Sequence, residues 1–160
     1  GRVIAREVLE RILEAGRLAP SACNGQPWHF TAITDPGLLV EVGKATSSLG
    51  MNRFVKDASA LVLITLEPTN ITSKLGCGIK DKDFPIMDLG IASAYITLAA
   101  EDEGVGSCIL GWFDEKQIKE LVGIPQKKRL MLIVSLGYAV KPKRKKIRKD
   151  SDKVVSFEKY

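Results

Sequence analysis

Hydrophobic residues near the start of the chain follow the period of an α-helix. Over residues 6–19 they recur at spacings of three and four, at Val8, Ile12, Ala15 and Ala19, which places them on one helical face. A strand is predicted at 28–34. The sequence Asp35-Pro36-Gly37 predicts a turn after it, followed by a short helix to about Ala45.

The middle of the chain contains two longer apolar segments. Residues 60–66 read Ala-Leu-Val-Leu-Ile-Thr-Leu, a continuous run that predicts a strand buried on both faces. Residues 70–85 are predicted to be a loop. A long helix at about 86–103 is rich in Gly, Ala and Ser, so we expect it to pack closely against its neighbours.

The second half has clear boundary signals. A strand is predicted at 107–112, and Asp114 with Gln117 three residues later predicts a helix N-terminus. Gly123 is expected to end that helix. Residues 129–139 predict another strand, and 154–157 regain strand character after a basic stretch.

Helices and strands therefore alternate imperfectly, which predicts an α+β or mixed α/β domain. We expect one domain over residues 1–160, with 141–160 as a basic, extended tail, because these last residues have too little apolar content to form a core. They are expected to lie along another surface, such as that of a partner subunit.

Composition narrows the function classes. Of the formal charge of +5, the tail 141–160 contributes +6, from nine Lys or Arg and three Asp or Glu, so the other 140 residues sum to −1. No apolar run is long enough to span a membrane, and no export leader opens the sequence. The three widely spaced cysteines, Cys23, Cys77 and Cys108, form no disulfide or zinc pattern and favour the cytoplasm.

Most side-chain chemistries lack their usual residues. His29 is the single histidine, so it would have to serve any Ser-His-Asp or Cys-His site, and we interpret it as structural. Neither a Walker A loop nor a strand followed by Gly-x-Gly-x-x-Gly is present. The glycines of Gly104-Val105-Gly106-Ser107 are interpreted as a helix C-cap and turn. An enzyme with this composition would take its chemistry from a cofactor.

One polar cluster stands between the first predicted helix and strand. Ser21, Asn24 and Gln26 are uncharged hydrogen-bonding residues within Pro20-Ser-Ala-Cys-Asn-Gly-Gln-Pro-Trp28. They suit a planar heterocycle better than a metal or a phosphate, although a solvent-facing turn would use the same residue types.

Residues 13–28, from Leu13 to Trp28, resemble the helix and Pro-Ser-x-x-Asn-x-Gln-Pro-Trp signature of the nitroreductase family of FMN-dependent oxidoreductases. Residues 104–111 are similar to that family's Gly-x-Gly-[Ser/Thr]-Cys-x-x-Gly segment, and Lys146-Ile147-Arg148 to its Lys-x-Arg phosphate clamp. The resemblance covers nearly the whole chain. It implies a three-layer α/β/α sandwich with a mainly antiparallel sheet, and a C-terminal strand that reaches the partner subunit.

The resemblance also implies a cofactor site at the interface of a homodimer. FMN would contact a set of residues from three segments: Pro20, Ser21, Ala22, Asn24 and Gln26 in the first, Ile109, Leu110 and Gly111 in the second, and Lys146 and Arg148 at the phosphate. NADH or NADPH would be the electron donor, and nitroaromatics, quinones or similar electrophiles the acceptors. The family usually opens with an Arg-x-Ser-x-Arg segment that also holds the phosphate; this sequence starts at Gly1-Arg2-Val3, so weaker FMN binding is expected if that segment is absent.

Other interpretations stay open beside this one. Residues 141–149 hold seven Lys or Arg and could bind nucleic acid in a non-enzymatic protein, although no aromatic residues are interleaved for base stacking. A family member specialised for dehalogenation or flavin breakdown is a further alternative.

Three single residues carry expectations of their own. Trp28 is expected in the core, and Cys108 is expected to be a buried thiol. Asp88 is expected to cap or pair at a dimer interface, or to be solvated.

Overall fold

The computed structural model describes residues 2–47, 50–69, 82–140 and 145–160. Four strands form one antiparallel sheet in the order β1-β2-β4-β3: β1 (Trp28–Ile33), β2 (Ala60–Leu66), β4 (Arg129–Gly137) and β3 (Gly106–Leu110). The helices are α1 (Arg6–Arg17), α2 (Pro36–Thr46), α4 (Phe84–Asp102) and α5 (Glu115–Val122), with short 3-10 turns η1 (Ala22–Asn24), η3 (Arg53–Asp57) and η4 (Ser151–Lys153).

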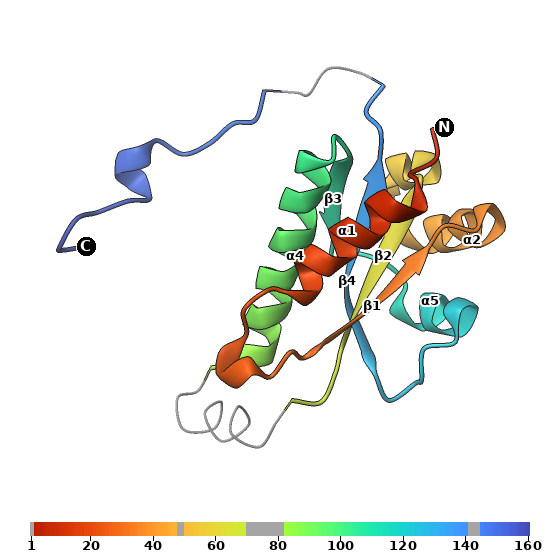
Figure 1. Cartoon of the computed structure of the whole chain (residues 1–160), viewed down its shortest axis with the longest axis horizontal. Helices are drawn as coiled ribbons and strands as arrows, with labels where there is room; N and C mark the ends of the chain where they lie inside the picture. Colours follow the sequence, from red (N-terminus) through yellow and green to blue (C-terminus); the bar gives the residue numbers. More distant parts are fainter. Residues whose placement is uncertain (1, 48–49, 70–81, 141–144) are drawn as a thin grey trace.

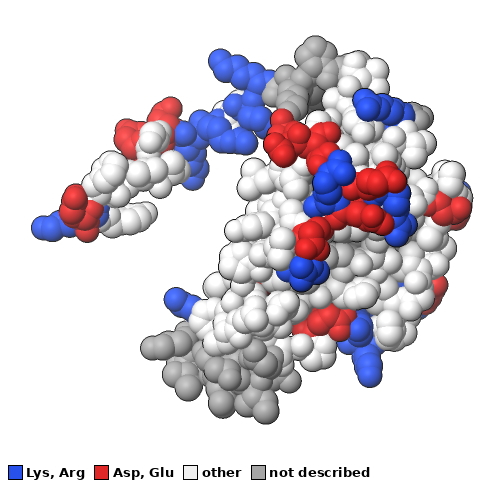
Figure 2. All heavy atoms as spheres, in the orientation of Figure 1, with Lys and Arg blue, Asp and Glu red and all other residues white. Residues whose placement is uncertain are grey.

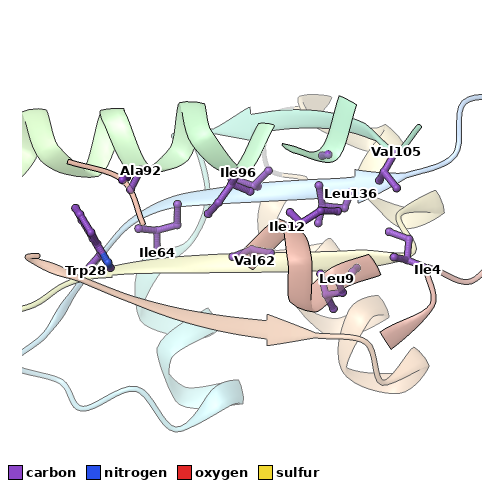
Figure 3. Close-up of a cluster of buried hydrophobic side chains, with 14 of the residues drawn as sticks. Ile4, Leu9, Ile12, Trp28, Val62, Ile64, Ala92, Ile96, Val105 and Leu136 are labelled. Atoms are coloured by element: carbon purple, nitrogen blue, oxygen red, sulfur yellow. The ribbon is translucent and has the colours of Figure 1, made fainter. Parts of the chain in front are cut away.

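Strand β2 lies at the centre of a three-layer sandwich. Its first five residues are fully buried, and their side chains alternate between two hydrophobic clusters. On one face Val62 and Ile64 pack with α1 and α4 (Figure 3). On the other face Leu61 and Leu63 pack with α2, η3 and α5. The predicted α+β class and the α/β/α layers are confirmed (Figure 1).

Local signals set most helix ends. The Asp114 carboxylate accepts the Gln117 backbone N–H at 2.9 Å, which confirms the predicted N-terminus of α5. Gly123 follows that helix with φ +73°. Gly104, with φ +70°, ends α4 by donating to the Glu101 carbonyl at 3.0 Å, which confirms the predicted cap and turn at this glycine. Gly106 is not in the turn, because it is the first residue of β3 and pairs with Gly137.

Two local predictions were wrong. Asp35-Pro36-Gly37 is a helix N-terminus rather than a turn, because the Asp35 carboxylate caps Leu38 N–H at 2.8 Å and Pro36 occupies the first helical position. Residues 154–157 form no strand within the described chain. They lie in the tail that extends away from the sandwich (Figure 1), where no neighbouring strand is available for pairing. The loop predicted at 70–85 falls largely outside the described residues.

Helices α1 and α4 approach each other closely at Gly16. A Cβ atom at this position would lie 2.6 Å from Ile96 Cγ1 and 2.9 Å from Ile96 Cδ1, and Ile96 is fully buried. The missing side chain therefore allows the two helices to pack directly over the same face of the sheet. Arg11, in the middle of α1, donates two hydrogen bonds of 2.6 and 2.8 Å to Glu103, the residue that follows α4.

We expect Gly16→Ala to destabilise the protein by about 1–3 kcal/mol, the usual range for overpacking, although alanine normally stabilises a helix. Gly43→Ala is the matched control, because its Cβ would meet nothing closer than 3.9 Å. It should stabilise α2 by up to about 1 kcal/mol. Urea unfolding of both variants measures the difference, and equal effects would contradict the close-packing account.

Candidate functional site

The segment between α1 and β1 folds into a strained polar loop. Cys23, Asn24 and Gln26 all have positive φ, at 51°, 50° and 45°. Left-handed backbone at a residue other than glycine costs of order 1 kcal/mol or more, and such residues cluster at functional sites. We call residues 20–26 the polar loop.

Hydrogen bonds inside the polar loop hold this conformation. The Ser21 hydroxyl oxygen accepts the Gln26 backbone N–H at 3.0 Å. The Gln26 side-chain amide donates to the Asn24 carbonyl at 3.3 Å and to Asn24 Oδ1 at 3.2 Å. The structure thus brings together the three residues that the sequence singled out, and the Gln26 side chain holds Asn24.

One contact from outside fixes the start of the polar loop. The Ala22 backbone N–H lies 3.1 Å from both Asp88 carboxylate oxygens. Asp88 stands near the N-terminus of α4 and is only 4% exposed. The alternative of a solvated Asp88 was wrong, because this buried carboxylate accepts the first backbone N–H of η1, as a capping residue does. The sequence signal that could have suggested this is that Asp88 is the single charged residue between Phe84 and Ala100. The pairing of Asp88 at a dimer interface stays a prediction.

A second part of the predicted site lies at the end of β3. The strand begins four residues after α4 ends and runs back along the helix (Figure 1). Ile109 is exposed, Leu110 is buried, and Gly111 follows at the surface. A Cβ at Gly111 would meet nothing within 4 Å, so a flat ligand could approach the backbone at this position.

Residues 111–114 connect β3 to α5, and we call them the Gly111 corner. Hydrogen bonds attach this connection to other parts of the fold. The Asn52 side-chain amide donates to the Thr46 carbonyl at 3.2 Å and to the Trp112 carbonyl at 3.0 Å. The Asp114 backbone N–H donates to the Ala45 carbonyl at 2.9 Å. Sequence reasoning missed Asn52, whose left-handed backbone (φ 55°) is decided by these tertiary contacts.

The third predicted part lies apart from the other two within one chain. Residues 145–150 are all exposed, and they belong to the tail that projects from the sandwich, where basic side chains gather (Figure 2). The Arg148 guanidinium donates to the neighbouring Ile147 carbonyl at 3.1 Å. Within a single chain, Lys146 and Arg148 are therefore not brought to the polar loop.

The structure also shows where three residues with other predicted roles lie. Trp28 is buried in the core as predicted, stacked with Phe30 at 6.2 Å between ring centroids. Cys108 is exposed on β3, so its prediction as a buried thiol was wrong: β3 is the outer strand of the sheet and this position is not covered. His29 is exposed on β1.

A groove beside the polar loop is lined by Glu10, Leu13, Glu14, Arg17, Gln26, Trp28, His29 and Phe30. Arg17 donates to both Glu14 carboxylate oxygens at 2.6 and 2.7 Å. These hydrogen bonds lower the pKa of Glu14 and raise that of Arg17.

Within the described residues, no group of His, Cys, Asp or Glu side chains is arranged to hold a metal ion, and no helix there is long and apolar enough to cross a membrane.

The structure is thus an α+β protein with an antiparallel sheet between two helical layers. Its strained polar loop and the open backbone at Gly111 carry uncharged groups. The family model of the nitroreductase family matches residues 2–50 and 41–138. A protein of Archaeoglobus fulgidus with the provisional name NADH dehydrogenase/NAD(P)H nitroreductase is 36% identical over 141 residues, which cover 86% of this chain and 75% of the relative. The chain therefore belongs to the nitroreductase family, and it is an oxidoreductase.

Further relatives extend the similarity. An oxygen-insensitive NADPH nitroreductase of Helicobacter pylori is 26% identical over 179 residues, covering 93% of this chain and 84% of the relative. The structure of an FMN-dependent nitroreductase from Clostridium difficile has a TM-score of 0.77 and 29% identity, covering 99% of this chain and 91% of that one. Both similarities extend over nearly all of the present chain.

The geometry of the polar loop leads to a steric prediction. A Cβ at Gly25 would overlap Thr69 Oγ1 and would lie 3.1 Å from the Ala22 carbonyl oxygen. Gly25→Ala should therefore displace the polar loop and speed amide exchange over residues 21–26, with a small effect on global unfolding. Hydrogen exchange with mass spectrometry measures this, and Gly43→Ala serves as control. Unchanged exchange over 21–26 would contradict the predicted displacement.

Proposed function

We propose that the protein is an FMN-dependent oxidoreductase. When bound, FMN would accept hydride from NADH or NADPH at N5 and pass it to a nitroaromatic, quinone or similar electrophile in a ping-pong sequence. The observation that carries the proposal is the polar loop. Its strained backbone is held by dedicated hydrogen bonds and presents uncharged polar groups at the surface.

Three separate segments of the chain carry groups that would suit different parts of an FMN molecule. Ser21, Asn24 and the backbone around Pro20 and Ala22 supply neutral groups for the polar edge of a flavin ring, with Gln26 fixing Asn24. At the other segment, the backbone at Ile109, Leu110 and Gly111 offers the open surface that a planar ring needs. Lys146 and Arg148 have the charge to bind a phosphate, and an Arg fork suits that geometry well.

A homodimer would unite these pieces. One side of α4 exposes apolar side chains at helical spacing, namely Met87, Ile91, Tyr95 and Leu98, and the flank formed by α4 is mostly uncharged (Figure 2). Contiguous apolar surface of this kind is typical of an interface. The tail adds exposed Val154, Val155 and Phe157, so an extended segment that gains no burial in its own protomer could bind to the partner.

Compartment and nucleic-acid binding stay predictions. The three cysteines without a disulfide pattern favour the cytoplasm. The described part of the basic run, residues 145–149, is exposed, which suits a phosphate clamp and a solvated tail equally. We favour the clamp because it serves the same cofactor as the polar loop.

The cofactor proposal is tested by titrating the purified protein with FMN and following flavin fluorescence and the visible spectrum. We expect quenching and a yellow protein. Gly111→Ala should weaken FMN binding about tenfold, equivalent to about 1.4 kcal/mol, because a methyl group would occupy the open surface. Gly43→Ala should bind as the wild type does. A wild-type protein that neither quenches FMN fluorescence nor becomes coloured would overturn the proposal.

The dimer proposal is tested separately by measuring mass in solution with light scattering. The wild type should have twice the mass of one chain. Leu98→Glu places a charge on the apolar side of α4, where residue 98 is 68% exposed, and should shift the population toward monomer. Val40→Glu, at an exposed apolar position of α2, is the control and should leave the mass unchanged. If Leu98→Glu also leaves it unchanged, α4 is not the interface.

A further inference from the structure

Asp88 occupies an unusual position for a carboxylate. It is buried at 4% exposure in the first turns of α4, and it accepts the Ala22 backbone N–H with both oxygens at 3.1 Å. Among the described residues, no Lys or Arg side chain forms an ion pair with it. A buried carboxylate is costly unless it is hydrogen-bonded, so this contact accounts for its place in the fold.

The polar loop needs support from outside itself. Three of its residues other than glycine have left-handed backbone, a conformation that persists only when the surroundings over-determine it. The Ser21–Gln26 and Gln26–Asn24 bonds are internal to the loop, so they can fix its shape without fixing its place. The Asp88–Ala22 contact joins the loop to a helix 66 residues further along the chain.

The contact between Asp88 and Ala22 lies where it can position the predicted binding residues of the polar loop. Ala22 is the first residue of η1 and directly follows Ser21. Asp88 belongs to the 19-residue helix α4, which also packs against β3, the strand that ends at Leu110 and Gly111. A shift of the Ala22 amide would therefore move Ser21 and Asn24 relative to the second part of the site.

We propose that Asp88 is a positioning residue for the cofactor site: it anchors the polar loop to α4 and so holds Ser21 and Asn24 in the geometry that binds FMN. This inference rests on the proposed function. Asp88 does not itself contact the ligand; it acts through the Ala22 amide, and its effect is on the affinity and the environment of bound flavin.

The test uses Asp88→Asn and Asp88→Ala in the full chain. Asparagine keeps the shape and one acceptor but turns an N–H₂ group toward the Ala22 amide, whereas alanine removes both acceptors. Asp35→Asn is the matched control, since Asp35 also accepts a backbone N–H, from Leu38 at 2.8 Å, but caps α2 on the other face of the sheet. Asparagine is an equally good N-cap, so this control should behave as the wild type.

The first readout is amide exchange in the absence of FMN. Exchange at Ala22 should be at least tenfold faster in Asp88→Ala than in the wild type and intermediate in Asp88→Asn, and it should be unchanged in Asp35→Asn. Unchanged exchange at Ala22 in Asp88→Ala would overturn the anchor, whether or not the protein binds FMN. Asp88→Asn keeps this measurement possible if the alanine variant folds poorly.

The second readout is FMN binding, measured for each variant at the same interval below its own unfolding temperature. The dissociation constant should rise about tenfold in Asp88→Asn, and the visible circular dichroism of the saturated flavin should change, since a merely structural role would leave both unaltered. A looser loop with unchanged affinity and dichroism would overturn the positioning role. Absence of FMN binding by the wild type would instead refute the proposed function, while the exchange experiment would still decide whether Asp88 holds the loop.

Discussion

Burial of the two central strands on both faces is the constraint on which the rest of the structure depends. Strand β2 pairs with β1 on one edge and β4 on the other, and Leu61 to Ile64 are inaccessible to solvent. A sheet with apolar side chains on both faces needs a helical layer on each. The pairs α1 and α4, and α2 and α5, provide these layers.

The same constraint places the candidate site at the periphery. Helices that cover the sheet must be joined to its strands by surface connections, and two of these connections carry the predicted binding residues. The polar loop joins α1 to β1, and the Gly111 corner joins β3 to α5. Helix α4 contacts both the polar loop and β3, so it can act as a common support for otherwise separate surface segments.

Much of this fold was predictable because its signals are local. The apolar run 60–66 defined β2, the three- and four-residue spacing defined α1, and Asp114 with Gly123 bounded α5. The predicted turn at Asp35-Pro36 was wrong because this residue pair can begin either a turn or a helix. Only the hydrogen bond from the Leu38 backbone N–H to Asp35 identifies the start of a helix. Cys108 was misread because nothing in an apolar strand of five residues reveals that it lies at the outer edge of the sheet.

For the candidate site, the sequence by itself determined the residue types: an uncharged polar cluster at 20–26, a glycine-bounded segment at 104–111 and a basic tail. These depend on composition and spacing, which are properties of neighbouring residues. Only the tertiary structure decided that Asp88 accepts the Ala22 amide, that Asn52 donates to the Trp112 carbonyl, and that the tail extends away from the sandwich. Each of these depends on contacts between segments tens of residues apart, whose meeting is set by the packing of helices against the sheet.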